Sequence, residues 1–293
     1  MELSFRNIGL MGRTDLPEVL DNLRQIAEFL SRAGCHVILE SSLAEALSAT
    51  QWQVSSVKLL GEASDLIIVV GGDGTLLGAS RLLTLGDTPV VGVNRGQLGF
   101  LTDILPDQME AQLKQILAGQ YQIERRFLLG CRIKRDRTPV ASELALNDVV
   151  LHSSAAVQMI EFDLYIDGEY VYTQRSDGVI VSSPTGSTAY ALSAGGSIMH
   201  PSLDAIAIVP MFPHTLSSRP IVVNANSEIK MIIGPCKDTP PQISCDGQAG
   251  IQLEVGDVVY VSKHTRWLHL LHPTSHNFYE ACRSKLGWSS SLI

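Results

Sequence analysis

Hydrophobic residues in the N-terminal part of the chain recur at two alternating spacings. Residues 7–11 and 35–39 form short apolar runs typical of strands, and residues 16–33 place apolar side chains at helical spacing until a glycine ends the run. The unbroken apolar run at 66–70, β-branched from Ile67 onward, is typical of a strand covered on both faces, as in a parallel sheet. The alternation continues with a helix at 76–83, a strand at 89–93 and a helix at 109–118. The pattern predicts a doubly wound, Rossmann-like α/β domain.

The pattern changes near Tyr121. Short alternating segments, separated by turn pairs such as Asp167-Gly168 and Asp246-Gly247, now predict strands, and they lie at 162–166, 179–181, 205–209, 221–223 and 258–261. Residues 278–286 return to a helical pattern. We therefore expect an α/β domain at 1–124, with the tail 277–293 packed back on it. A β-rich, sandwich-like domain is expected at 125–276.

A glycine-rich turn, Gly71-Gly72-Asp73-Gly74-Thr75, follows the buried strand at 66–70. A strand passes to a helix here, so free backbone N–H groups and the positive end of the helix dipole both face the turn. Glycines let the backbone approach an anion closely, and Thr75 is placed to cap the following helix. We expect Gly71, Gly72, Gly74 and Thr75 to bind phosphate.

Asp73 within this turn has two interpretations. An acid in a glycine turn is commonly an Asx-turn residue with a structural role. Beside a phosphate site, however, a carboxylate repels the anion unless it holds a cation or receives a proton. The second interpretation makes Asp73 the candidate catalytic residue.

Composition and charge exclude several function classes. The formal net charge of -8 argues against a protein that neutralises many nucleic-acid phosphates. The five cysteines are odd in number and contain no C-x-x-C pair, which suits a reducing compartment. The sequence has neither a secretory leader pattern nor a long apolar segment. We expect a cytoplasmic protein with no membrane partner.

The longer motifs resemble one family. The P-loop pattern and the protein-kinase H-R-D loop are missing, and Gly92, Gly96 and Gly99 do not have G-x-G-x-x-G spacing. The turn and residues 89–103 (PVVGVNRGQLGFLTD) resemble the NAD kinase family, which shares a G-G-D-G turn with the diacylglycerol and sphingosine kinases and with 6-phosphofructokinase. Three further blocks agree: LNDVV at 146–150, SDGVIVSSPTGSTAYALSAGG at 176–196 and PHTLSSRP at 213–220. The resemblance covers nearly the whole chain and implies an ATP-dependent kinase of the bacterial type that makes NADP from NAD.

This resemblance also implies roles for individual residues. Asp73 would be the base facing the 2′-hydroxyl of the adenosine ribose, with Gly74 beside it. Asn147 and Asp148 would hold the adenosine end and its ribose hydroxyls, although many members of the family have Asn-Glu at these positions. The other implied substrate contacts are Thr188, Ala189, Tyr190 and Ser193 near the adenine, Asp177 at the nicotinamide half, often from a neighbouring subunit, Arg175 at a position associated with preference for NAD over NADH, and Gln248. The family further implies Mg²⁺ carried by ATP, NAD binding by the second domain, and a homodimer or homotetramer.

The same segments also have plain structural interpretations. Residues 185–188 suit a turn and helix cap as well as a nucleotide contact, and Tyr190 suits a core position as well as a stacking surface. Asn147-Asp148 suits a turn, yet the pair is embedded in apolar residues, where unpaired polar groups are costly. The sequence leaves these alternatives open.

Histidines near the C-terminus, at His264, His269, His272 and His276, invite a metal-site interpretation. Their spacing crosses a predicted strand and a proline, and no cysteine or acid lies between them, so we expect no metal site. His214 in the P-H-T-L segment is either a packed or a catalytic histidine.

Two other function classes remain open on the sequence. A lipid kinase with the same turn needs an apolar face that reaches a membrane. A non-catalytic NAD sensor keeps the dinucleotide pocket and loses the acid, which is present here as Asp73.

Overall fold

The computed structural model describes residues 3–83, 87–96, 98–154, 159–215, 217–236 and 240–288. The chain folds as two compact units, one containing residues up to Arg125 and from Leu268 onward, the other containing Arg126–Trp267. The expected domain changes were at 124/125 and 276/277. The second change falls earlier because one uninterrupted strand, β17 (Val258–Pro273), passes from the second unit into the sheet of the first. Residues 289–293 of the expected tail, and Gln97 and Leu216 of the motif blocks, lie outside the described residues.

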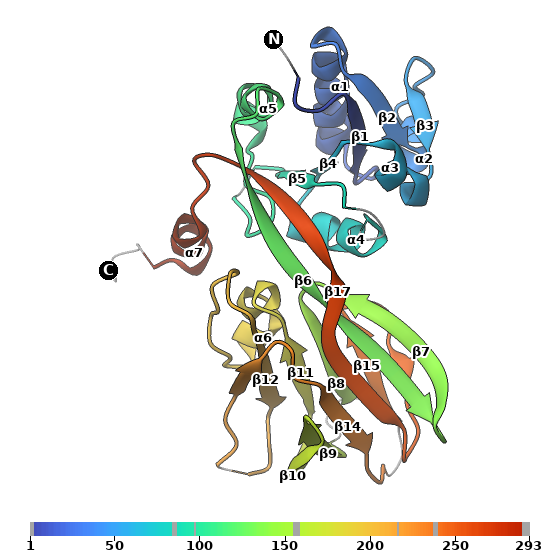
Figure 1. Ribbon diagram of the computed structural model, residues 1–293, viewed down its shortest axis with the longest axis vertical. Coiled ribbons are helices and arrows are strands. Elements are labelled where there is room, and N and C mark those ends of the chain that lie inside the picture. Colours follow the sequence, from blue (N-terminus) through green and yellow to red (C-terminus); the bar gives the residue numbers. More distant parts are fainter. Residues whose placement is uncertain are drawn as a thin grey trace. The chain divides into compact units, whose positions relative to one another are not determined.

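Strands and helices alternate in the first unit (Figure 1). In chain order they are β1 (Asn7–Gly12), α1 (Pro17–Arg32), β2 (His36–Glu40), α2 (Ser41–Ala46), β3 (Gln53–Ser55), α3 (Val57–Ala63), β4 (Leu66–Val70), α4 (Asp73–Leu83), β5 (Val90–Val93), η1 (Pro106–Gln108), α5 (Met109–Leu117) and, after the second unit, α7 (Phe278–Leu286). A further strand, β6 (Tyr121–Arg135), crosses the first boundary between the units.

The first unit is built on a parallel sheet in the order β17-β5-β4-β1-β2-β3. Apolar residues of α1 and α5 pack with one face of the sheet, around Ile8, Leu10 and Ile68. Helix α3 approaches the other face so closely that a Cβ atom on Gly9 would lie 2.9 Å from Leu60. Helices therefore cover both faces, which explains why all five residues of β4 are buried and apolar. The predicted doubly wound domain is confirmed.

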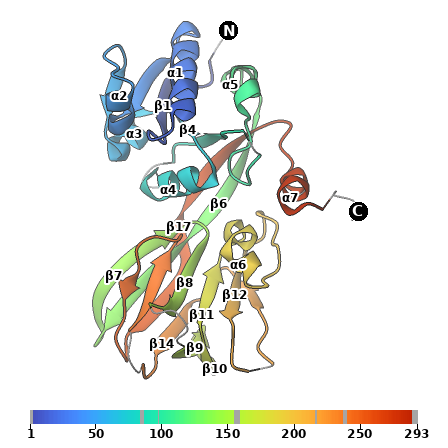
Figure 2. The same ribbon diagram turned by 180° about the vertical axis from the view of Figure 1, so that it is seen from behind.

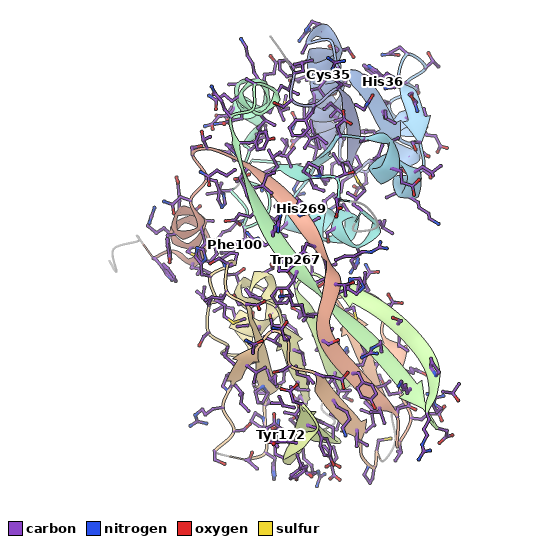
Figure 3. All side chains as sticks on the ribbon, in the orientation of Figure 1. Cys35, His36, Phe100, Tyr172, Trp267 and His269 are labelled. Atoms are coloured by element: carbon purple, nitrogen blue, oxygen red, sulfur yellow. The ribbon has the colours of Figure 1, made fainter. Side chains whose placement is uncertain are left out.

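Helix α7 belongs to the first unit. The side chain of Asn277 caps its first turn by accepting hydrogen bonds from the backbone N–H groups of Tyr279 and Glu280, and Gly287 ends it with a left-handed φ of 66°. Phe278 packs near the ring of Phe100, which Figure 3 labels, with centroids 6.2 Å apart. The predicted helix at 278–286 has these bounds in the structure.

The second unit contains two mainly antiparallel sheets, seen from behind in Figure 2. Besides β6 and β17, the elements of this unit are β7 (Thr138–Ala145), β8 (Asp148–Ser153), β9 (Ile160–Ile166), β10 (Glu169–Ser176), β11 (Gly178–Ser182), η2 (Thr185–Thr188), α6 (Tyr190–Ser193), β12 (Ala205–Met211), β13 (Ile221–Asn224), β14 (Ile229–Ile233), β15 (Pro241–Cys245) and β16 (Ile251–Gln252). One sheet has the order β10-β9-β14-β17, with β6 paired to β17 and to β7, and the other has the order β13-β12-β11-β8-β15-β16.

Both sheets of the second unit contribute to one apolar core. Phe162 and Met231 from the first sheet pack in the same cluster as Val149 and Val181 from the second. The outer face of the second sheet carries a smaller cluster in which Ala191 of α6 packs. This arrangement is the predicted β-rich, sandwich-like domain.

All five cysteines are free, and four of them are buried. Among the described residues, no helix combines the length and apolar character that a membrane crossing requires.

Candidate active site

The glycine turn of the first unit lies between β4 and α4, as the sequence indicated. The N–H of Gly71 donates to Val93 O at 2.8 Å, which ties the start of the turn to the neighbouring strand. Among the described residues, no acceptor takes the N–H groups of Gly72, Asp73 or Gly74. These amides stand at the N-terminus of an 11-residue helix, so they and the helix dipole together suit a phosphate group.

Thr75 does not cap this helix, so that part of the prediction was wrong. Helix α4 begins at Asp73, earlier than the apolar pattern suggested, because the N–H of Thr75 already donates to Gly72 O at 2.9 Å. The side chain of Thr75 lies over the turn, where a Cβ atom on Gly71 would be 2.4 Å from its Oγ1. Gly71 is therefore required by close packing.

The carboxylate of Asp73 is held by the loop that follows β5. Its Oδ2 accepts a hydrogen bond from the N–H of Phe100 at 2.9 Å. Its Oδ1 accepts three, from the N–H of Leu101 at 3.1 Å and from the N–H and hydroxyl of Thr102 at 3.2 and 3.0 Å. The Asx-turn interpretation is thus wrong in its detail, because the donors lie 27 to 29 residues further along the chain.

Two cations missed by sequence reasoning line a cavity beside the turn. This cavity, of about 740 Å³, is bordered by Gly72, Asp73, Gly74, Arg95 and Lys285, together with residues that include Glu18 and Asn94. Arg95 lies inside the motif block at 89–103, but Lys285 lies on α7, more than two hundred residues from the turn in sequence. Only the fold brings Lys285 to this cavity.

In the second unit, Asp246 holds the Asn147-Asp148 segment. Its Oδ1 accepts hydrogen bonds from the N–H groups of Asn147 and Asp148 at 2.8 and 3.2 Å, and its Oδ2 accepts one from Leu146 at 2.9 Å. Asp246 and Gly247 both have positive φ, so the Asp-Gly turn after β15 aims this carboxylate back at β8. Sequence reasoning identified Asp246 only as a turn residue, whereas the structure gives it a positioning role.

Asp148 is a buried acid without a hydrogen-bond partner for its side chain among the described residues. It is 4% exposed. Burial, together with the charge of Asp246, raises the pKa of Asp148 to about 7. A buried carboxylate without a compensating partner is costly, and such perturbed groups gather at functional sites. The turn interpretation of this pair does not account for that cost.

The segment at 185–193 packs directly on Asn147. It forms a 3-10 turn, η2, and a short helix, α6, and a Cβ atom on Gly186 would lie 2.2 Å from Asn147 O. Thr188 and Ala189 are half-buried and Ser193 is exposed. Tyr190 is 48% exposed, so the interpretation of Tyr190 as a core residue is wrong. The structure thus brings Asn147, Asp148 and the 185–190 segment together.

Arg175 and Asp177 lie at the opposite end of β11 from this group. Strand β11 pairs Ser182 with Asp148 at one end and Gly178 with His152 at the other. Asp177 directly precedes Gly178, so roughly 17 Å of strand separates it from the Asn147 group at about 3.4 Å per residue. Arg175, with a side chain 63% exposed, lies 3.9 Å from a carboxylate oxygen of Glu161. Gln248 is exposed after the Asp246-Gly247 turn.

The histidines divide into different settings. His214 donates its backbone N–H to Arg175 O at 3.0 Å, which places it beside the far end of β11. His264 belongs to the second unit, whereas His269, labelled in Figure 3, belongs with His272 and His276 to the first. In the part of the chain that the structure describes, His272 and His276 are the two of these histidines that cluster with an acid, Asp103.

Comparison with protein families accounts for both units. The family model for the ATP-NAD kinase N-terminal domain matches residues 8–121, and the model for the ATP-NAD kinase C-terminal domain matches residues 146–272. The chain is 56% identical over 288 residues to the NAD kinase of Azotobacter vinelandii, with 98% of each chain covered. It is 58% identical over 287 residues to the NAD kinase of Hahella chejuensis, covering 98% of this chain and 97% of that one.

Solved structures show the same similarity. Yeast NADH kinase complexed with NADH has a TM-score of 0.87 at 25% identity, covering 98% of this chain and 89% of that chain. An NAD kinase from Archaeoglobus fulgidus in complex with ATP has a TM-score of 0.74 at 27% identity, covering 96% and 97%. These matches favour neither the lipid kinase nor the non-catalytic sensor.

Proposed function

This chain belongs to the NAD kinase family, and we propose that it transfers the γ-phosphoryl group of ATP to the 2′-hydroxyl of the adenosine ribose of NAD, giving NADP and ADP. The observation that supports this most directly is the turn at 71–75, where three amides that find no acceptor among the described residues adjoin the carboxylate of Asp73. A relative solved with ATP and another solved with NADH support binding of both kinds of substrate.

Asp73 is the proposed general base for the sugar hydroxyl. A carboxylate has about four lone-pair positions, and three of the four hydrogen bonds go to Oδ1, which leaves Oδ2 with room for one more donor. The loop thus fixes the orientation of the carboxylate while leaving one position open. Phosphoryl transfer through a loose transition state depends mainly on such alignment, and the base removes the proton as the new bond forms.

The phosphates of ATP are proposed to bind at the same turn. The amides of Gly72, Asp73 and Gly74 donate to phosphate oxygens, and Arg95 and Lys285 neutralise their charge. Mg²⁺ arrives with ATP and offsets charge on the donor phosphates. The few carboxylates at the cavity, Glu18 and Asp73, suit an ion held chiefly by phosphate and water.

The adenosine part of NAD is proposed to bind in the second unit. Asn147 and Asp148 offer an amide and a carboxylate, which suit ribose hydroxyls, and Asp246 holds their backbone in place. Thr188 and Ala189 border the adenine, with Ser193 near it. The exposed ring of Tyr190 offers a stacking face. Gln248 is proposed as a further ligand contact.

Asp177 and Arg175 are proposed to serve the nicotinamide half of a dinucleotide bound by a neighbouring subunit. Their place at the far end of β11 from Asn147 supports this division. The active protein is then a homodimer or homotetramer. Its five free cysteines suit a cytoplasmic protein.

One assay tests the function. Purified chain is incubated with NAD and MgATP, and NADP is measured with an NADP-specific dehydrogenase. We expect NADP to form in equal amount to ADP, and ATP hydrolysis without NADP would contradict the proposal. Binding of NAD without turnover would instead identify a sensor, and phosphorylation of diacylglycerol in liposomes would identify a lipid kinase.

A further inference from the structure

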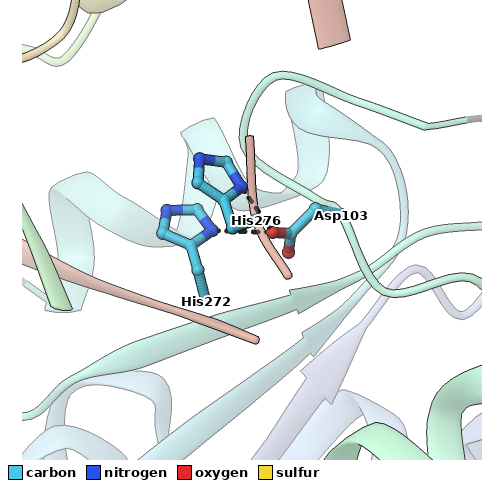
Figure 4. Close-up of side chains that lie close together, drawn as sticks. All are labelled: Asp103, His272 and His276. Carbon is cyan, nitrogen blue, oxygen red and sulfur yellow. Dashed lines mark hydrogen bonds and ion pairs between the residues drawn. The ribbon is translucent and has the colours of Figure 1, made fainter. Parts of the chain in front are cut away.

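Asp103, His272 and His276 form a cluster in the first unit that the proposed reaction does not use (Figure 4). One oxygen of Asp103, Oδ2, lies 2.9 Å from Nδ1 of His272 and 2.8 Å from Nδ1 of His276. The two imidazole rings stack with centroids 3.8 Å apart and 20° between their planes. The side chains of the two histidines are 1% and 8% exposed.

Asp103 determines which ring nitrogens carry hydrogen. Its Oδ2 lies within hydrogen-bond distance of both Nδ1 atoms, and a single carboxylate oxygen cannot donate to two ring nitrogens at once. An ionised carboxylate can only accept, so both Nδ1 atoms must donate. In a neutral imidazole that carries its hydrogen on Nδ1, Nε2 has a free lone pair. Both rings present Nε2 on the side away from Asp103 (Figure 4).

Those two Nε2 atoms are buried, and no described residue provides a hydrogen-bond partner for either of them. Glu124, on β6, faces them with one oxygen 3.7 Å from Nε2 of His272 and the other 3.9 Å from Nε2 of His276. Both separations are too long for hydrogen bonds. Two ligand atoms bound to one tetrahedral ion by bonds of about 2.1 Å lie roughly 3.4 Å apart. The two separations between Nε2 and the Glu124 oxygens, 3.7 and 3.9 Å, are close to this value.

We propose that His272, His276 and Glu124 bind a divalent transition-metal ion of the zinc class, with Asp103 orienting both imidazoles. Two imidazole nitrogens and a carboxylate form a three-ligand set that leaves a further position for water. A carboxylate that accepts from Nδ1 of a metal-binding histidine is a common supporting partner. Nitrogen ligands favour zinc-class ions over Mg²⁺, so the site is separate from the magnesium that ATP carries.

The fold gives such an ion a structural role. Its ligands come from the start of β6, the end of β17 and the segment before α7, while Asp103 follows the loop that holds Asp73. Binding draws the Nε2 edges of the stacked rings together. The ion therefore joins the start of β6 to residues 272–276, which lie far from it in the sequence, and stabilises the first unit.

The test uses the full chain without a histidine tag, stripped with EDTA and titrated with ZnCl₂ by calorimetry. We expect one Zn²⁺ per chain, a raised Tm, and no displacement by millimolar Mg²⁺. His272→Gln, His276→Gln and Glu124→Gln should each weaken binding at least tenfold. Asp103→Asn should weaken it by roughly 10- to 100-fold, as expected of a supporting partner. His269→Gln, on the same strand but outside the cluster, is the matched control and should bind like the parent chain.

A second measurement does not depend on the variants folding. Co²⁺ added to the stripped parent chain should give visible d–d absorption that Zn²⁺ removes. Absence of both a stoichiometric Zn²⁺ isotherm and that absorption would overturn the proposal, leaving a metal-free hydrogen-bonded cluster. Unchanged Zn²⁺ binding in a folded His272→Gln/His276→Gln double variant would overturn it equally.

Discussion

Gly99 and Asp73 approach each other so closely that a Cβ atom on Gly99 would lie 2.1 Å from Oδ1 of Asp73. Gly99→Ala must therefore push the loop at 98–102 away from the carboxylate. We expect the free energy of unfolding to fall by roughly 1–3 kcal/mol, the usual cost of overpacking. Because the loop orients the proposed base, kcat should fall as well. Urea unfolding and steady-state kinetics measure the two effects.

Gly78→Ala is the control for this substitution. Gly78 lies within α4, and an added Cβ atom meets nothing within 4 Å. Alanine in a helix restricts the unfolded chain, so we expect stability to stay level or rise by roughly 0.4–1 kcal/mol. If Gly99→Ala matched Gly78→Ala in stability and kcat, the close approach would have no functional importance.

Asp73→Asn tests the proposed base. We expect turnover to fall by roughly 10²- to 10⁴-fold while NAD still binds. The sequence alone indicated a normally folded variant, but the structure changes that expectation. Asparagine would place an NH₂ group toward backbone N–H donors of residues 100–102, so the Tm should fall too. Turnover near that of the parent chain would exclude Asp73 as the base.

Thr102→Val separates chemistry from support. It removes the hydroxyl that donates to Oδ1 of Asp73 and accepts from Nδ2 of Asn94 at 2.6 Å, but it keeps the carboxylate. Losing these buried hydrogen bonds should lower the free energy of unfolding by about 1–3 kcal/mol. The fall in kcat should be much smaller than in Asp73→Asn. Equal losses of kcat in both variants would mean that Asp73 acts only as a support.

Local patterns predicted the elements well and the contacts between them poorly. The run at 66–70 and the pattern at 278–286 correspond to β4 and α7 because burial and capping act within a few residues. The passage of β17 from one unit into the other does not change the hydrophobic pattern of the sequence, because a strand has the same periodicity whichever strands it pairs with. The domain change inside β17 therefore escaped sequence analysis, whereas the change inside β6 was expected within one residue because the hydrophobic pattern itself changes near Tyr121.

The same limit applies to the candidate site. The turn at 71–75 was recognisable because its glycines and acid are consecutive. The residues that complete the candidate site are not consecutive in the sequence. Asp73 binds residues 100–102, Asp246 binds residues 146–148, and Lys285 reaches the turn from α7. His272 and His276 meet an acid 169 and 173 residues away, which spacing arguments could not find.

Asp148 should make stability depend on pH. Its pKa is about 7 in the folded chain against about 4 when unfolded, so the folded chain holds the proton more tightly. The resulting stability is fully present below about pH 4 and is lost as the pH rises through 7. Its size is on the order of 4 kcal/mol. Asp148→Asn should flatten the decline between pH 5 and pH 8 in urea unfolding.

Asn147→Ala serves as the comparison for Asp148. It alters the neighbouring side chain without removing a titratable group, so the decline between pH 5 and pH 8 should persist. A parent chain whose stability rises over this interval, with Asp148→Asn behaving identically, would show that Asp148 stays ionised in the folded state.

Lys285→Ala tests the cation beside the turn. One lost charged hydrogen bond to phosphate costs about 1.5–3 kcal/mol, so KM for ATP should rise at least tenfold while KM for NAD changes little. Arg283→Ala removes an exposed cation from the same last turn of α7 without touching the cavity. A matching rise in KM for ATP in both variants would point to general surface charge instead of a contact by Lys285.

Mixing two inactive variants tests whether neighbouring subunits share active sites. If Asp73 and Asp177 serve one dinucleotide from different chains, a heterodimer of Asp73→Asn with Asp177→Ala contains one intact site and one doubly altered site. Random exchange at equal amounts makes half of the dimers mixed, so about one quarter of the parent activity should return. Size-exclusion chromatography confirms that subunits have exchanged. If subunit exchange is complete and the activity still equals the sum of the two separate variants, both aspartates belong to the site of a single chain. Asp177 would then not contact the nicotinamide of a dinucleotide bound by a neighbouring subunit.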